Sequence, residues 1–308
     1  TTVKENLKIL LNAAKERNQP PEHLLFYGPP GVGKTTLAHL IAETISAPIK
    51  ITSGPAIEKV GDLASILTNL APGDILFIDE IHRLNKTVEE VLYPAMESGK
   101  LNIIIGKGPG ARVIQLDLSP FTLIAATTRI ALLSSPLRSR FSGGIFRLDF
   151  YTEPEVGLII ERSSEILGTP VDRAVARLLA SRSRFTPRTA NQLLKRCRDF
   201  AQLNKTPITL EVVQQTLTLL GIDDRGLTTE DRKIMEAIIH KFRGGPVGVN
   251  TIATATSEEV ETIEEVHEPY LIQIGFLERT SRGRQATKHA YQHFKLAPPA
   301  NLVQLFNQ

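Results

Sequence analysis

The sequence predicts an α/β domain built on a parallel sheet, then an all-helical segment, then a small domain of helices with one hairpin. Short apolar runs recur at five places: 23–27, 48–52, 75–79, 121–128 and 145–150. Helical patterns separate the earlier runs, and this alternation is typical of a parallel sheet with helices on both faces. Helical spacing alone continues from Glu153 to about Leu220. We therefore expect domains at 1–150, 151–222 and 223–308.

The composition is that of an ordinary soluble globular protein. The 308 residues are 42% hydrophobic and 22% charged, and the formal net charge of +3 excludes a polycation. No apolar run approaches the roughly 18 residues needed to span a bilayer, and no signal peptide is visible. The chain begins at Thr1 rather than Met, which is typical of a trimmed chain. The single cysteine, Cys197, fits a reducing compartment, so we expect a cytoplasmic protein without membrane association.

A complete phosphate-binding loop (Walker A) follows the first apolar run. Residues 28–35 read Gly-Pro-Pro-Gly-Val-Gly-Lys-Thr and lead into a helical pattern. The glycines let backbone N–H groups face phosphates, and the positive end of the next helix faces the same anion. Lys34 is expected to reach the β- and γ-phosphates, and the Thr35 hydroxyl to bind Mg²⁺. The predicted nucleotide contacts are Gly28, Pro29, Pro30, Gly31, Val32, Gly33, Lys34, Thr35 and Thr36.

Two further apolar runs end in residues that suit hydrolysis of a nucleoside triphosphate. The run 75–78 is followed by Asp79, expected to hold Mg²⁺ through water, and Glu80, expected to polarise the attacking water. Thr128 ends the run 121–128, and ligands of parallel sheets gather at that edge. Thr128 is a candidate to orient water or sense the γ-phosphate. The alternative is a hydroxyl bonded to local backbone.

Arginines supply the expected positive charge at the reacting phosphate. Arg138 and Arg140 follow the run 121–128 closely, which suggests an arginine finger worth about 10³–10⁵ in rate. The alternative for them is a surface salt bridge. Arg188 follows Thr186 and Pro187 at a helix start, inside a basic stretch (171–200, net +6), and is expected to lean onto the γ-phosphate.

Taken together, these motifs resemble the AAA+ ATPases and, in detail, the RuvB family. The matching segments are 79–84, 126–129, 136–141, 186–188, 242–248 and 268–272, and the likeness covers nearly the whole chain. The resemblance implies a P-loop AAA+ sheet, a helical lid, and a winged helix, with ATP, ADP and Mg²⁺ as ligands. It assigns Thr128 as sensor 1, Arg188 as sensor 2, and Arg140 rather than Arg138 as a finger that reaches a neighbouring subunit. It therefore implies a hexameric ring.

The same resemblance implies a motor for branch migration of Holliday junctions in DNA recombination and repair. Residues 101–105 and 113–118 read as two strands joined by a turn, and this hairpin is expected to contact a RuvA-like partner through Ile103, Ile104 and Ile105. The alternative is a hairpin folded against its own core. Two other functions stay open: a clamp-loader-like AAA+ switch, and a DNA-binding regulator that uses nucleotide only as a ligand.

The last domain is expected to bind double-stranded DNA through its hairpin rather than its third helix. Helices at 229–242, 249–255 and 257–271 followed by a hairpin across 281–284 describe a winged helix. Residues 257–268 contain six Glu and no Lys or Arg, so phosphates would repel that helix. The wing arginines Arg279, Arg282 and Arg284 suit phosphates of any sequence. His289 and His293 lack a third metal ligand, so we expect surface histidines.

Three departures from the family pattern are visible. Phe185 stands where the family usually has Gly before Thr-Pro-Arg, and the segment 142–144 is one residue longer than usual. Family members also carry a segment before the first helix that helps to enclose adenine, whereas this chain starts inside that helix. We expect these departures to affect nucleotide affinity and the aim of Arg140.

Overall fold

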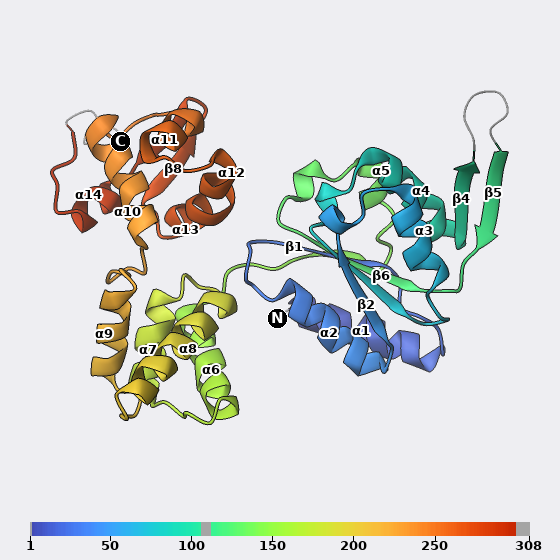
Figure 1. Cartoon of the computed structure of the whole chain (residues 1–308), viewed down its shortest axis with the longest axis horizontal. Coiled ribbons are helices and arrows are strands. Elements are labelled where there is room, and N and C mark those ends of the chain that lie inside the picture. Colours follow the sequence, from blue (N-terminus) through green and yellow to red (C-terminus); the bar gives the residue numbers. More distant parts are fainter. Residues whose placement is uncertain (1, 106–111, 300–308) are drawn as a thin grey trace. The chain divides into compact units, whose positions relative to one another are not determined.

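The computed structural model describes residues 2–105 and 112–299. The chain divides into two compact units, Thr1–Asp149 and Phe150–Gln308. In Figure 1 the first unit runs from blue to green, and the second from green to red.

The first unit contains the predicted parallel sheet. Its five strands lie in the order β2-β3-β6-β1-β7, and every neighbouring pair is parallel. Their bounds are β1 (Leu24–Tyr27), β2 (Ile49–Ser53), β3 (Ile75–Asp79), β6 (Thr122–Thr127) and β7 (Gly144–Arg147). The five predicted runs are confirmed with small shifts at their ends. Because β6 separates β1 from β3, the three strands that precede the predicted site residues are adjacent.

Helices cover both faces of this sheet, as predicted. Their bounds are α1 (Thr2–Glu16), α2 (Lys34–Ile45), α3 (Val60–Thr68), α4 (Lys86–Ser98) and α5 (Ser135–Arg138). Side chains of a strand alternate between faces. Accordingly, Phe77 of β3 packs with α1 and α2, whereas Leu76 and Ile78 pack with α3 and α4. An apolar layer therefore lies on each face of the sheet, and Figure 1 shows α1 and α2 on one side of it and α3 and α4 on the other.

The predicted hairpin is confirmed as β4 (Lys100–Ile105) paired antiparallel with β5 (Arg112–Asp117). Leu101 is fully buried and Ile103 packs partly against the core of the first unit. By contrast, Val113 is 65% and Ile114 43% exposed. The predicted partner contacts Ile104 and Ile105 have side chains that lie outside the described residues. The strand β4 therefore anchors the hairpin, and β5 presents its apolar side chains to solvent.

The second unit begins with four helices around their own core. They are α6 (Glu153–Ile166), α7 (Arg173–Arg182), α8 (Pro187–Leu203) and α9 (Leu210–Leu219). The helix starts predicted at Glu153 and after Thr186 are confirmed, and Thr152, Asp172 and Thr186 each accept a hydrogen bond from a first-turn N–H. Cys197 is fully buried in this core, and burial raises the pKa of its thiol to about 11. It is therefore a packing residue.

A separate core follows in the C-terminal part of the second unit, and the domain boundary near residue 223 stays a prediction. Its elements are α10 (Thr229–Glu236), α11 (Val249–Thr256), α12 (Val260–Thr262), α13 (Glu268–Gln273), β8 (Leu277–Thr280), β9 (Gly283–Ala286) and α14 (Lys288–His293). The strands β8 and β9 form the predicted wing.

The third helix, predicted over 257–271, begins later, at Val260, and continues to Gln273 with one π-helical turn inside it. Ser257 has φ 56°, a left-handed conformation that ends α11, so helical structure resumes only at Val260. The turn Ile263–His267 is π-helical, and it precedes Pro269 near the start of α13. Proline has no N–H to donate to the preceding turn, and a wider turn accommodates this loss. A π-helical turn also replaces the end of the predicted helix 229–242, at Ala237–Lys241.

Within 2–105 and 112–299, no helix has both the length and the apolar character needed to cross a membrane.

Candidate nucleotide-binding and hydrolysis site

The site lies at the carboxyl ends of β1, β6 and β3. The phosphate-binding loop follows β1, Thr128 follows β6, and Asp79 ends β3. Register pairs Leu25 with Ala125 and Ile78 with the same Ala125, so the three strand ends lie at one level. The topology therefore brings together the residues that sequence reasoning placed on separate motifs.

Two glycines give the loop its shape. Gly28 has φ 149°, and a Cβ at this position would lie 2.0 Å from the backbone oxygen of Leu148. Gly33 adopts a left-handed conformation with φ 97° at the N-cap of α2. Because glycine supplies no side-chain oxygen to the first N–H groups of α2, an anion can take that place. The loop is thus shaped for phosphate, with no room for a side chain at Gly28.

Lys34 lies over this loop at the start of α2. Its side chain is largely buried, and Nζ donates to the carbonyl oxygens of Gly28 and Pro29, both at 2.8 Å. An ammonium group held by two carbonyls can turn to a phosphate with little displacement, and a phosphate carries more negative charge than a carbonyl. The structure thus places the cation beside the predicted position of the phosphates.

Thr35 and Asp79 form the predicted metal pair. Thr35 Oγ1 donates to Asp79 Oδ2 at 3.3 Å, and Asp79 Oδ1 accepts the N–H of Glu80 at 2.9 Å. Mg²⁺ prefers oxygen ligands and usually keeps several waters, taking one or two groups from the protein. A hydroxyl and a carboxylate in contact at the end of the loop fit that requirement.

Glu80 is held by polar groups from β6 and from its own turn. It adopts a left-handed conformation with φ 47°. Its Oε2 accepts a hydrogen bond from Thr128 Oγ1 at 3.2 Å and lies 3.2 Å from His82 Nδ1. His82 Nδ1 is also 2.9 Å from Thr127 Oγ1. The Thr128 hydroxyl therefore contacts the predicted catalytic carboxylate, and the alternative of a backbone bond is not what the structure shows.

His82 was not among the predicted site residues. Its side chain is 6% exposed, directly beside Glu80. The signal available in the sequence was a histidine two residues after Glu80 within the matched segment 79–84. His82 adds a second polar contact that fixes the direction of the Glu80 carboxylate.

Arg140 lies within its own unit, against α4. Its Nη2 is 2.9 Å from Glu97 Oε1, its Nη1 donates to the Pro136 carbonyl at 2.6 Å, and its guanidinium sits 4.4 Å from the Tyr93 ring centroid. Its Nε is buried without a hydrogen-bond partner among the described residues. In the single chain, Arg140 thus makes the salt bridge that was the alternative to a finger.

Arg188 is exposed in the first turn of α8, where Thr186 caps the helix. It belongs to the second unit, whereas the loop and the two acids belong to the first.

The three arginines of the wing differ in exposure. Arg282 is exposed at the turn, and the Arg279 side chain is 59% exposed beside Glu264. Arg284 is only 8% exposed and forms ion pairs with Glu268 and, at 2.7 Å, with Glu264. Two glutamates four residues apart hold Arg284 inside the domain, so the acidic helix anchors the wing. The contact of Arg284 with DNA stays a prediction.

The two histidines of α14 also differ from one another. His293 is part-buried, with Nε2 2.9 Å from Asp223 Oδ2, so it is not the free surface histidine that was predicted. His289 is exposed. Asp223 also accepts the N–H groups of Arg225 and Leu227 through Oδ1, so it organises its own loop.

Comparison with known proteins gives three family matches that follow one another along the chain. Residues 1–148 match the Holliday junction DNA helicase RuvB P-loop domain, 151–223 the RuvB AAA lid domain, and 224–295 the RuvB C-terminal winged helix domain. The chain is 58% identical over 295 residues to the Holliday junction branch migration complex subunit RuvB of Dehalococcoides mccartyi, covering 96% of this chain and 84% of that protein. It is 55% identical over 304 residues to the same-named subunit of Chloroflexus aggregans, covering 98% and 87%.

Solved structures agree with these matches. The Thermotoga maritima RuvB Holliday junction branch migration motor is 49% identical, with a TM-score of 0.88 over 97% of this chain and 95% of that one. This chain belongs to the RuvB family of AAA+ proteins.

Proposed function

We propose that this chain hydrolyses ATP and uses it to drive branch migration of Holliday junctions in DNA recombination and repair. The observation that carries the proposal is the Thr128–Glu80 contact beside a complete phosphate-binding loop. A module that only binds nucleotide has no need for a carboxylate directed by a neighbouring strand. The names of the relatives state branch migration for those proteins.

Each residue has a specific task in hydrolysis. Lys34 leaves the loop carbonyls for the β- and γ-phosphates, and Thr35 with Asp79 holds Mg²⁺. When bound, Mg²⁺ neutralises charge on the phosphate oxygens. Glu80 orients the attacking water and accepts its hydrogen bond, while Thr128 keeps the carboxylate directed at the γ-phosphate. Arg188 senses that phosphate from the lid.

Arg140 is proposed to complete the pocket of a neighbouring copy in a hexameric ring. To do so, the guanidinium of Arg140 gives up its ion pair with Glu97 and forms one with the more highly charged γ-phosphate. A bidentate guanidinium suits phosphate and carboxylate alike, so the exchange conserves the kind of contact. Its buried Nε, which has no partner among the described residues, gains one in the exchange.

The wing and the hairpin are proposed to bind the partners. Arg282 and Arg279 meet the phosphates of double-stranded DNA at a four-way junction, without reading sequence. The apolar side chains of β5, Val113 and Ile114, offer a docking surface for a RuvA-like protein. Ile103 packs on the core instead and supports the hairpin from beneath.

The decisive experiment compares the wild-type chain with Glu80→Gln, using ATP and a synthetic four-way junction in the presence of the RuvA-like partner. The amide keeps the size of the side chain but cannot act as a base. We expect nucleotide binding to be retained, and both phosphate release and junction migration to be lost. Migration that persists in Glu80→Gln would refute the proposed role of Glu80.

DNA contact is tested separately with Arg282→Ala. We expect weaker binding to every duplex sequence in equal measure, and a slope of log affinity against log salt that is shallower by about one. A loss confined to one sequence contradicts contact through phosphates.

A further inference from the structure

Two consecutive residues just before α8 adopt a backbone conformation that normally requires glycine. Arg184 and Phe185 both have φ 56°. In this left-handed region the Cβ of an L-residue crowds the neighbouring carbonyl oxygen, so the conformation persists only where surrounding contacts hold it. Thr186, the N-cap of α8, follows at once, and Arg188 lies in the first turn of that helix. The strained pair therefore lies directly before the N-terminus of α8, the lid helix that carries Arg188.

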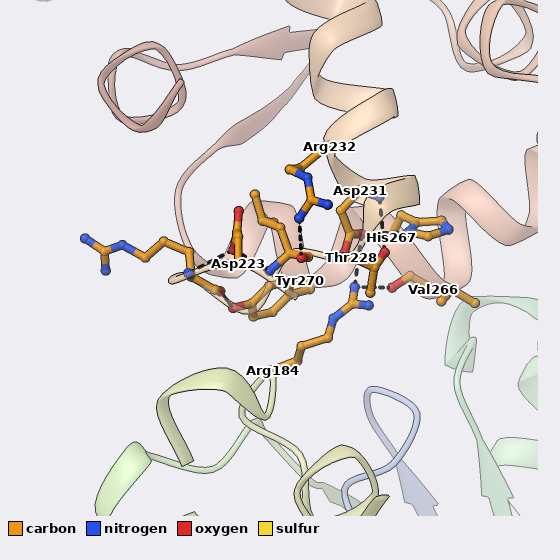
Figure 2. A network of polar contacts seen from close by, with 10 residues as sticks. Arg184, Asp223, Thr228, Asp231, Arg232, Val266, His267 and Tyr270 are labelled. Atoms are coloured by element: carbon orange, nitrogen blue, oxygen red, sulfur yellow. Dashed lines mark hydrogen bonds and ion pairs between the residues drawn. The ribbon is translucent and has the colours of Figure 1, made fainter. Parts of the chain in front are cut away.

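The Arg184 side chain crosses from the lid to three elements of the winged helix (Figure 2). Its Nη2 lies 3.3 Å from Asp231 Oδ1 on α10 and donates to the Val266 carbonyl at 3.0 Å. Its guanidinium carbon is 4.7 Å from the ring centroid of Tyr270 on α13. The side chain is 13% exposed. One guanidinium thus contacts a carboxylate, a carbonyl and an aromatic face, which Lys cannot match in geometry.

Asp231, the carboxylate that pairs with Arg184, is held in place and kept ionised by its neighbours. It is fully buried, caps α10 by accepting the Thr228 N–H at 2.8 Å, and lies 2.7 Å from His267 Nδ1. Burial alone raises the pKa of Asp231, but the hydrogen bond from His267 and the charge of Arg184 outweigh it and lower the pKa. The acceptor is therefore an anion inside the winged-helix domain, and its partner comes from the lid.

Phe185 adds two contacts. Its ring lies 6.0 Å from that of Tyr270, and its carbonyl accepts the Tyr151 N–H at 3.1 Å. Tyr151 is where the chain enters the lid, directly before the cap of α6. Tyr270 is tied in turn through its hydroxyl, which donates to the carbonyl of Arg225. Phe185 thus connects the start of the lid with the third helix of the wing domain.

We propose that Arg184 and Phe185 form a coupling joint that makes the lid and the winged helix move as one body, so that nucleotide-dependent movement at α8 reaches the DNA-binding wing. Arg184 is a positioning residue: it touches neither nucleotide nor DNA. The inference rests on the proposed function, because it takes ATP hydrolysis as the source of movement. It adds the specific connection by which the lid transmits that movement.

The test uses the full-length chain with the RuvA-like partner and compares Arg184→Met with Arg196→Ala. Methionine keeps an unbranched side chain of similar length and removes the guanidinium, and with it the ion pair and the contact with the Tyr270 ring. Arg196 lies on α8, the helix that follows Arg184, and pairs with Asp199 inside the lid, so its variant removes equal charge without touching the joint. ATP turnover without DNA, turnover with a four-way junction, migration per ATP, and hydrogen exchange of the α10 and α13 amides are measured.

For Arg184→Met we expect ATP turnover without DNA within about twofold of wild type, and migration per ATP at least tenfold lower. Amide exchange in α10 and α13 should rise, while exchange in α6 and α7 is unchanged. The Arg196→Ala variant should match wild type in all measurements. Turnover and migration that fall in equal proportion, or migration that is unchanged, overturn the joint.

Two more variants keep the test decisive. Arg184→Lys retains the charge but loses the planar contact, so it should fold and give a partial loss of migration per ATP; full activity there overturns the proposal even if Arg184→Met does not fold. Arg188→Ala tests the proposed function alone. If Arg188→Ala leaves ATP turnover intact, Arg188 is not the sensor. The migration per ATP of the Arg184 variants tests the coupling joint independently of that outcome.

Discussion

Thr128→Val changes one atom of the proposed active site and should slow hydrolysis without weakening nucleotide binding. The hydroxyl donates to the Glu80 carboxylate at 3.2 Å and makes no other hydrogen bond described here. A hydrogen bond to a charged group contributes about 1.5–3 kcal/mol. Since 1.36 kcal/mol is a tenfold change in rate, kcat should fall by about 10- to 150-fold. Valine has nearly the same shape as threonine, so the strand β6 should keep its packing.

The assay is phosphate release at saturating ATP, with nucleotide affinity measured separately by binding of a fluorescent ADP. Thr44→Val is the matched control, because its hydroxyl donates to the Leu40 carbonyl on an exposed part of α2. We expect unchanged kcat in the control and an unchanged Kd in both variants. A loss of kcat below about threefold in Thr128→Val, or a Kd that weakens in proportion, refutes the positioning of Glu80 by Thr128.

Three other changes test separate parts of the structure. Gly28→Ala should weaken nucleotide binding by about tenfold or more, because the new Cβ meets a backbone oxygen 2.0 Å away at a positive φ; equal affinity by titration contradicts the assigned loop shape. Arg284→Ala should lower the stability of the winged helix by about 3–5 kcal/mol in thermal unfolding, because Glu268 is left buried without its partner. Arg282→Ala, its exposed neighbour, should not change stability by more than about 0.5 kcal/mol. Burial lowers the pKa of His23 in the folded chain below the value of about 6.5 that it has in the unfolded chain. As the pH drops below about 6.5, the unfolded chain therefore binds a proton that the folded chain does not, and the free energy of unfolding should fall. A His23→Gln variant should lose this pH dependence in denaturant titrations from pH 7.5 to 5.5, and a parallel decline in both proteins argues against it.

Prediction from sequence was most successful where chemistry and local pattern coincide. The five strands of the parallel sheet are apolar runs because their side chains pack in the core, and this made them recognisable. The phosphate-binding loop was recognisable because its spacing of glycines, lysine and threonine is specific. What the structure added was the order of the strands in the sheet. The sequence alone does not say that β6 lies between β1 and β3, and only this order brings Thr128 to Glu80.

Prediction was least complete where tertiary contacts decide. Arg284 looks like a DNA contact in a basic hairpin, but the strand β9 places it against Glu264 and Glu268, where it offsets the charge of a buried glutamate that would otherwise have no cation beside it. The third helix starts later than predicted because Ser257, in a left-handed conformation, ends α11, and one of its turns is π-helical before Pro269, which lacks an N–H. Arg184 escaped notice because its partners, Asp231, Val266 and Tyr270, lie far along the chain, whereas His82 lies only two residues from Glu80 and was missed despite that signal.

Shared pockets between copies are best tested by mixing Arg140→Ala with Glu80→Gln. Each variant alone should be inactive, because every pocket in its ring lacks one of the two groups. In an equal mixture about a quarter of the pockets combine an intact carboxylate from one subunit with an intact guanidinium from the next. We expect ATP turnover to reappear in the mixture at up to that fraction of the wild-type rate. Full turnover by Arg140→Ala alone, with no recovery on mixing, would contradict an arginine that acts on the neighbouring subunit.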